Sequence, residues 1–215
     1  MKKQILIMIL VVLSITLSGC VQQSPPPVNY FTYVNNTLSY NGTLSVEKLQ
    51  LENPHYDFLY FPASIIKTAG TSNIPDATTY GYAFSHTNEE QLFITSQIPN
   101  IRVPDSDVIP HFNWHTNDDS AGDVVWCIEY SWTNIGDVVQ PPITECLVGS
   151  SQLDSDIIIL TNNITINGTG KEGFSVFKSR IYRDVLDPRD TYNNDALFNQ
   201  FDLRFKVNTF GVENQ

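Results

Sequence analysis

Hydrophobic and polar residues alternate along much of this chain with a period of two, which is the spacing of a β-strand. The clearest example spans residues 201–208, where the apolar positions are Phe201, Leu203, Phe205 and Val207. The residues between them are Asp202, Arg204, Lys206 and Asn208. We therefore predict a strand here with one buried face and one polar face.

A second strand is predicted over residues 124–132, with aromatic residues on its buried face. Its apolar positions are Trp126, Ile128, Tyr130 and Trp132, and the other face carries Cys127, Glu129 and Ser131. Similar patterns predict strands at residues 56–61, 91–98, 108–115, 157–161 and 173–183. Clusters of Gly, Pro, Asn and Asp separate the segments at residues 100–107, 117–123 and 162–170.

Many short strands, polar turns and the lack of a sustained helical pattern after the N-terminal segment predict an all-β protein. We expect an antiparallel β-sandwich, jelly-roll-like, in which two sheets pack face to face. Residues 64–79 are weakly patterned. We expect this segment to cross from one sheet to the other.

The first twenty residues predict export from the cytoplasm. Lys2 and Lys3 precede an apolar run over residues 5–17, and Cys20 follows small residues. Residues 17–20 resemble the lipobox of prokaryotic lipoproteins, which implies cleavage before Cys20 and acylation of its thiol. The alternative is an uncleaved membrane anchor, although the run is shorter than the roughly 20 residues of a spanning helix.

Both alternatives place the rest of the chain outside the cytoplasm. We expect a signal peptide at residues 1–19, a lipidated Cys20 with a proline-rich tether at residues 20–28, and a single β-sandwich domain at residues 29–215. The protein is then extracytoplasmic and attached to the membrane by its N-terminal lipid.

The formal net charge of −11 argues against nucleic-acid binding, because an acidic surface repels phosphate groups. Apart from Cys20, the chain has two cysteines, Cys127 and Cys146. The oxidising side of a membrane permits a disulfide between them, and two buried free thiols are the alternative. If they pair, closing the loop stabilises the fold by about 3 kcal/mol.

No sequence motif predicts catalysis. The chain has no GxSxG, SxxK or HExxH motif. Adjacent acids occur at residues 89–90 and 118–119, but no motif ties them into the carboxylate pair of a glycosidase. We therefore expect a protein that is not an enzyme.

Metal and cofactor sites are not predicted either. His111 and His115 fall on one face of a predicted strand, but a regular strand separates their Cα atoms by roughly 13 Å, too far for one metal ion. Two Asp-Ser-Asp triplets, at residues 105–107 and 154–156, offer oxygen ligands of the kind that Ca²⁺ accepts. Neither continues into an EF-hand loop, so we assign no metal and no cofactor.

Aromatic residues near turns suggest ligand binding, because a flat ring stacks on a sugar while Asn and Asp side chains bind its hydroxyls. Such residues are Tyr30, Tyr33, Tyr80, Tyr82 and Tyr192, of which Tyr80, Tyr82 and Tyr192 are the binding candidates. The alternative is that these rings pack in the core. Four Asn-x-Thr sequons make Asn35, Asn41, Asn163 and Asn167 candidates for glycosylation.

Several segments resemble a family of phage and prophage structural proteins. Residues 190–197 and 201–211 combine an Asp-Thr-Tyr turn with an alternating strand. Residues 109–114 resemble the family's Pro-His-x-His-Trp strand, residues 125–132 resemble the Trp-rich strand that follows it, and residues 56–63 resemble its entry strand. The resemblance covers about residues 56–211. Asn113 departs from it, since the family tends to carry a histidine there, and the lipoprotein-like leader is not typical of the family.

This resemblance implies a non-catalytic β-sandwich that is capsid- or tail-associated in a virus particle. Its partners would be copies of itself or other virion or surface proteins, bound through sheet edges and aromatic patches. The alternative function is that of a cell-surface lipoprotein whose β-sandwich binds carbohydrate or a protein partner.

Overall fold

The computed structural model describes residues 31–34, 37–40, 50–68 and 73–209. The chain divides into two compact units, at residues 1–47 and 48–215. In the first unit, β1 (Phe31–Val34) and β2 (Thr37–Tyr40) form an antiparallel pair. Several predicted features lie outside the described residues. They are the signal peptide, Cys20, the tether, the expected domain start at residue 29, and two sequon asparagines, Asn35 and Asn41.

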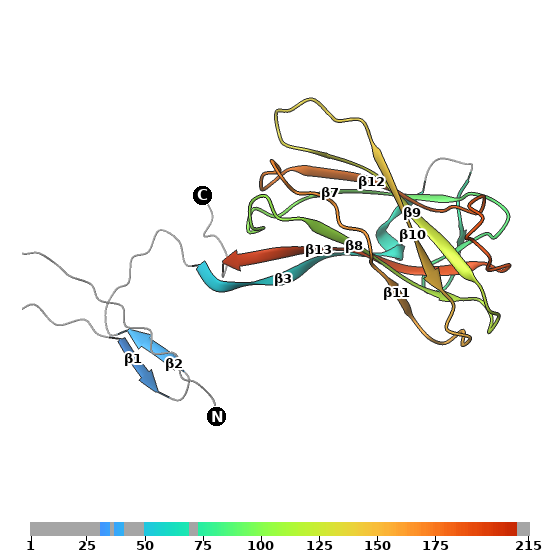
Figure 1. The fold of residues 1–215 in the computed structure, drawn as a ribbon, viewed down its shortest axis with the longest axis horizontal. Helices are drawn as coiled ribbons and strands as arrows, with labels where there is room; N and C mark the ends of the chain where they lie inside the picture. The colour runs from blue at the N-terminus through green and yellow to red at the C-terminus, as the bar shows by residue number, and fades with distance from the viewer. Residues whose placement is uncertain (1–30, 35–36, 41–49, 69–72, 210–215) are drawn as a thin grey trace, which may run out of the picture. The chain divides into compact units, whose positions relative to one another are not determined.

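Two sheets form the second unit (Figure 1). The six-stranded sheet consists of β3 (Gln50–Pro62), β5 (Asp76–Ala77), β6 (Tyr82–Phe84), β8 (Val108–Thr116), β11 (Ile159–Thr161) and β13 (Ala196–Thr209). The five-stranded sheet consists of β4 (Lys67–Thr68), β7 (Gln91–Gln97), β9 (Asp123–Thr133), β10 (Ile143–Ser150) and β12 (Val176–Arg183). A 3-10 turn, η1 (Ala63–Ile65), follows β3.

The last strand, β13, lies in the middle of the six-stranded sheet. On one side it pairs with β8, and on the other side it pairs first with β6 and then with β3. The strand order is β11-β8-β13-β6-β5 in this sheet and β10-β9-β12-β7-β4 in the other. All strand pairs in the described part of the chain are antiparallel.

The core between the sheets is built around Trp126 of β9. Four rings of the six-stranded sheet surround it, with centroids 5.1–6.1 Å away: Phe84, Phe112, Trp114 and Phe198. Because Trp126 comes from the five-stranded sheet and the four rings from the other, this cluster joins the two layers. Burial of such large rings supplies much of the hydrophobic stabilisation.

The structure confirms the all-β, antiparallel sandwich that the period-two pattern predicts. The predicted apolar faces of β9 and β13 lie in the core, while Cys127 lies on the other face of β9. The segment at residues 64–79 crosses between the sheets as expected, since β4 joins one sheet and β5 the other.

The prediction missed β10 and placed the start of β12 too early. β10 is an edge strand whose first two residues are exposed, so its sequence lacks a strict alternation. Residues 173–175 precede β12 as turn and coil, and residues 157–158 precede β11 in the same way. Within the described ranges, no helix is long and apolar enough to cross a membrane.

The structure joins Cys127 and Cys146 in a disulfide. The two residues lie directly opposite each other on β9 and β10. The disulfide therefore attaches the edge strand to the sheet on the face that points away from the core.

Candidate functional site

The outer face of the six-stranded sheet, which points away from the core, carries a row of three aromatic residues. Tyr56, Phe58 and Tyr60 alternate along β3 with Asp57, Leu59 and Phe61. Leu59 and Phe61 pack against the core. Since successive side chains of a strand point to opposite faces, the three rings lie on the outer face.

These rings form an accessible surface. The ring centroids of Phe58 and Tyr60 lie 5.6 Å apart with an angle of 23° between their planes. Tyr60 is 59% exposed and Tyr56 is 39% exposed. Large exposed rings on a regular strand are unusual unless they contact a ligand or another surface.

Strand pairing places polar residues of β13 directly beside the aromatic row. Tyr60 is opposite Asp202, Phe58 is opposite Arg204, and Tyr56 is opposite Lys206. We call these six residues, together with His111, Asn113 and Gln200, the aromatic–polar face. It combines apolar rings with hydrogen-bonding groups, as ligand sites generally do.

Asp202 is the buried acid of this face. It is 6% exposed, and its two carboxylate oxygens accept hydrogen bonds from Asn113 Nδ2 at 2.9 Å and Gln200 Nε2 at 2.6 Å. Burial raises the pKa of Asp202, while the two hydrogen bonds lower it. The two amide groups are thereby oriented by the carboxylate.

His111 lies beside Asp202, across the β8–β13 pair. Its ring centroid is 5.6 Å from that of Phe58, and its Nε2 atom is buried with no hydrogen-bond partner. Burial lowers the pKa of His111, and the neighbouring Arg204 lowers it further against the opposing effect of Asp202. This unpaired polar atom is enclosed by protein atoms, so a ligand would reach it only after its neighbours move.

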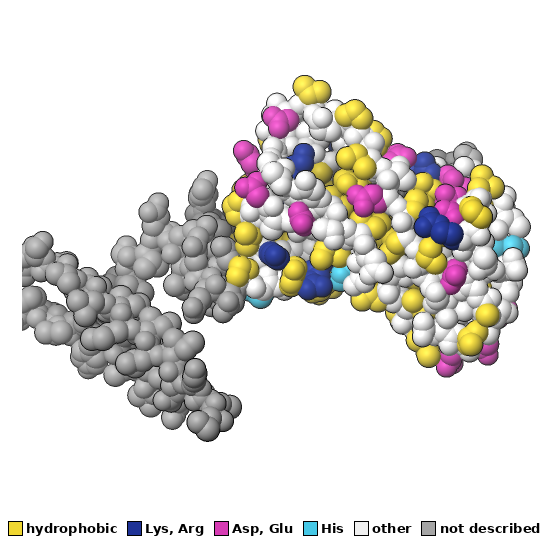
Figure 2. Space-filling view, viewed as in Figure 1, with side chains coloured by type: hydrophobic (Ala, Val, Ile, Leu, Met, Phe, Trp, Pro, Cys, Tyr) yellow, Lys and Arg dark blue, Asp and Glu magenta, His cyan; other side chains and the backbone are white. Residues whose placement is uncertain are grey.

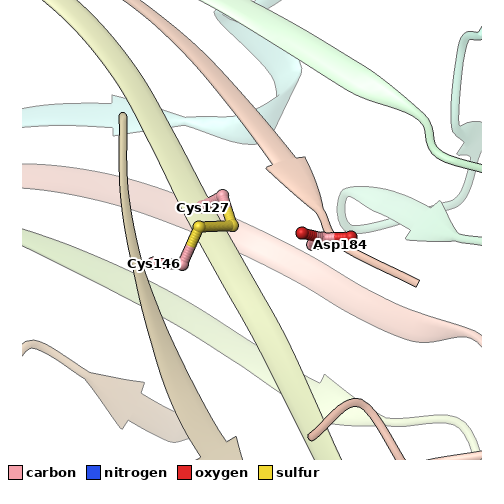
Figure 3. A group of neighbouring side chains, drawn as sticks. All are labelled: Cys127, Cys146 and Asp184. Carbon is pink, nitrogen blue, oxygen red and sulfur yellow. A yellow bond between two sulfur atoms is a disulfide. The ribbon is translucent and has the colours of Figure 1, made fainter. Parts of the chain in front are cut away.

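His115 lies two positions beyond Asn113 on β8, and its Nδ1 atom lies 2.9 Å from Asn199 Oδ1. Among the described residues, the group with spacing suited to a metal ion is instead Cys127, Cys146 and Asp184 (Figure 3). Because the two sulfur atoms are bonded to each other, they are not thiolate ligands. This group is therefore not a metal site.

Two of the predicted binding residues, Tyr80 and Tyr82, line a hollow of about 310 Å³. Its other lining residues are Ser64, Ala77, Thr78, Thr79 and Gly81. Tyr80 is 83% exposed, whereas Tyr82 is half-buried and packs against the core. The hollow lies at the start of β6, and its lining includes none of the three rings of the row on β3.

Gly81 sets the position of this turn, because a Cβ atom there would collide with the carbonyl oxygen of Phe198 in β13. We expect Gly81→Ala to lower the free energy of unfolding by about 1–3 kcal/mol, since β6 must move away from β13. Urea denaturation measures the change. Thr79→Ala, at an exposed position of the same turn, is the control and should unfold like the wild type. Equal stability of both variants would contradict the close approach.

The third predicted binding residue, Tyr192, has a different role. It is 1% exposed, so the prediction that its ring stacks on a sugar is wrong. Its hydroxyl accepts hydrogen bonds from the backbone N–H groups of Asn117 and Asp118 and donates one to Asp118 Oδ1. Tyr192 therefore anchors the loop between β8 and β9, which its place in a turn did not reveal.

A second hollow, of about 510 Å³, lies beside the loop between β9 and β10. Its walls include Tyr130, Trp132, Pro141 and Pro142. The loop exposes three large apolar side chains, which are Ile135, Val138 and Val139, and Ile143 at the start of β10 is exposed as well. Figure 2 shows hydrophobic side chains at the outer end of this projecting loop.

The acidic pairs and triplets have local structural roles. Glu89 forms an ion pair with Arg180 at 2.5 Å, and Asp119 Oδ1 accepts a hydrogen bond from the backbone of Ser155. Asp105 and Asp107 accept hydrogen bonds from the backbone of residues 168–170.

The sequon residues Asn163 and Asn167 are exposed. Asn167 Oδ1 accepts a hydrogen bond from the backbone N–H of Thr169. Both positions are accessible to modification, and their glycosylation stays a prediction.

No family model matches the chain, and no curated protein matches it. Among solved structures, it is similar to the CBM36-1 domain of a multidomain xylanase from the hindgut metagenome of Trinervitermes trinervoides. The TM-score is 0.40 at 10% sequence identity, over 74% of this chain and 100% of that domain. A TM-score of this size supports no inference about function. The expected relationship to phage structural proteins stays a prediction.

Proposed function

We propose that this protein binds carbohydrate through the aromatic–polar face. The observation that carries the proposal is the row of Tyr56, Phe58 and Tyr60 beside the hydrogen-bonding groups of β8 and β13. The proposal concerns binding alone, without catalysis. With the export that the leader predicts, the ligand would be a glycan outside the cytoplasm.

The aromatic rings and the polar groups would make different contacts with the sugar in this proposal. The faces of Phe58 and Tyr60 would stack on the C–H face of a sugar, which removes apolar area from water. Asn113 and Gln200 donate to Asp202 through their nitrogens, so their amide oxygens point elsewhere and can accept from sugar hydroxyls.

The proposal predicts that Tyr60→Ala weakens glycan binding about tenfold, which corresponds to about 1.4 kcal/mol for one stacking contact. A glycan array with the full chain identifies the ligand, and isothermal titration calorimetry measures the affinity of each variant. Because Tyr60 is 59% exposed, its replacement should leave the fold intact.

Two variants serve as controls. Tyr60→Phe retains the ring and should bind nearly as well as the wild type. Tyr80→Ala removes the exposed ring of the other hollow and should have no effect. A larger loss for Tyr80→Ala than for Tyr60→Ala would place the site at the hollow and contradict the proposal, as would a wild-type protein that binds no glycan.

A further inference from the structure

Positive charge is scarce in this protein, and two of its cations lie next to each other at one end of the aromatic–polar face. The chain has 12 Lys and Arg residues against 23 Asp and Glu residues. Arg204 and Lys206 lie two residues apart on β13 and both approach the ring of Tyr56. Arg204 Cζ is 3.6 Å and Lys206 Nζ is 5.9 Å from the ring centroid.

Among residues 54–68 and 73–207, whose side chains the structure describes, no acid forms an ion pair with Arg204 or Lys206. The ion pairs there use Arg180, Arg183, Arg189 and His86, and no described carboxylate lies within 4.0 Å of Arg204 or Lys206. The Nε atom of Arg204 is also buried with no hydrogen-bond partner. A guanidinium that is partly desolvated and lacks an acceptor is prepared to bind an anion.

Asp202 is not the acceptor that the Arg204 guanidinium lacks. It is two residues from Arg204 on the same face, but its oxygens accept from Asn113 and Gln200 instead. His111 lies opposite Asp202 across the β8–β13 pair, and its Nε2 atom is likewise buried and unpaired. Two buried polar atoms without partners, from β8 and β13, therefore occur on one face.

We propose that Arg204 and Lys206 bind an anionic substituent of the glycan, a carboxylate or a sulfate, while Tyr56 contacts the ring that carries it. This inference rests on the proposed function and specifies its ligand as an acidic polysaccharide. The planar guanidinium offers two parallel donors to either anion, and the Tyr56 ring holds it in place. The ammonium of Lys206 adds a second positive charge.

The test compares three polysaccharides with related backbones, a neutral galactan, polygalacturonate and a sulfated galactan. The full chain should bind at least one of the two acidic polymers about tenfold more tightly than the neutral one, and added salt should reduce this preference. Polygalacturonate and the sulfated galactan separate a carboxylate ligand from a sulfate ligand.

Substitutions of Arg204 and Lys206 test whether these two cations cause the preference for acidic polymers. Arg204→Met and Lys206→Met should each lower the affinity for the acidic polymer about tenfold, and by more than they lower the affinity for the neutral galactan. Arg204→Lys should lose less, since it keeps the charge. Lys178→Met removes an exposed lysine of the five-stranded sheet and should have no effect.

The possible failures are distinguishable. Equal binding of neutral and acidic polymers, reduced by Tyr60→Ala, would overturn the anion site and leave the carbohydrate proposal standing. Acidic binding that Arg204→Met and Lys206→Met leave unchanged would also overturn the anion site. Absence of binding to all three polymers would overturn this inference, and the glycan array then decides the proposed function separately.

Discussion

Replacement of Arg183 by methionine is expected to lower the free energy of unfolding by about 3–5 kcal/mol. Arg183 is fully buried and binds both carboxylate oxygens of Asp190, at 2.6 and 2.9 Å. It also donates to the backbone carbonyls of Asn194 and Tyr192. Without the guanidinium, the carboxylate of Asp190 and these carbonyls lose their main charged partner in a dry environment.

Urea denaturation of the two variants Arg183→Met and Arg189→Met tests this expectation. Arg189 forms the same kind of ion pair with Asp187, but the Arg189 side chain is exposed and Asp187 is only partly buried, so the loss of this pair should change stability little. The double variant Arg183→Met/Asp190→Asn should regain part of the loss, because it removes the uncompensated charge. If Arg183→Met unfolds at the same urea concentration as Arg189→Met, the buried pair is not needed for stability.

The double variant Cys127→Ala/Cys146→Ala is expected to lose about 3 kcal/mol of stability. The disulfide closes a loop with a sequence separation of 19 residues, so its removal gives the unfolded chain more freedom. β10 is an edge strand that pairs with β9 alone among the described strands, and the disulfide lies in the middle of that pair. Its loss therefore also weakens the attachment of β10.

Urea denaturation with and without a reductant measures this contribution. The wild type should become less stable in reductant, whereas the double variant should show no change. The outcome that would count against a stabilising disulfide is a wild type with the same unfolding curve in both conditions, once mass spectrometry has verified that both thiols are free.

The strands with a strict period of two are predictable from the sequence, and the site is only partly so. β13 alternates over its whole predicted length and β9 does so from Trp126 onward, because one face of each fills the core. β10 lies at an edge, where three of its eight residues are exposed and the alternation disappears. Local patterns therefore identify interior strands better than edge strands.

The aromatic–polar face depends on pairing between distant strands, which local patterns do not specify. Tyr56, Phe58 and Tyr60 do alternate along the predicted strand, but Leu59 and Phe61 are apolar as well, so the sequence does not show which set faces the core. The register of β3 against β13 decides it and brings Arg204 beside Phe58. Tyr192 is a residue whose local sequence is misleading. Its position in a turn suggested exposure, but its hydroxyl instead accepts hydrogen bonds from backbone N–H groups.

The position of β13 has a consequence for the order of events during synthesis. The last described strand lies between β8 on one side and β3 and β6 on the other, so the six-stranded sheet lacks its central member until β13 has been made. A growing chain that has not yet reached β13 therefore has no complete sandwich. The export that the N-terminal segment predicts would then take place before this sheet is assembled.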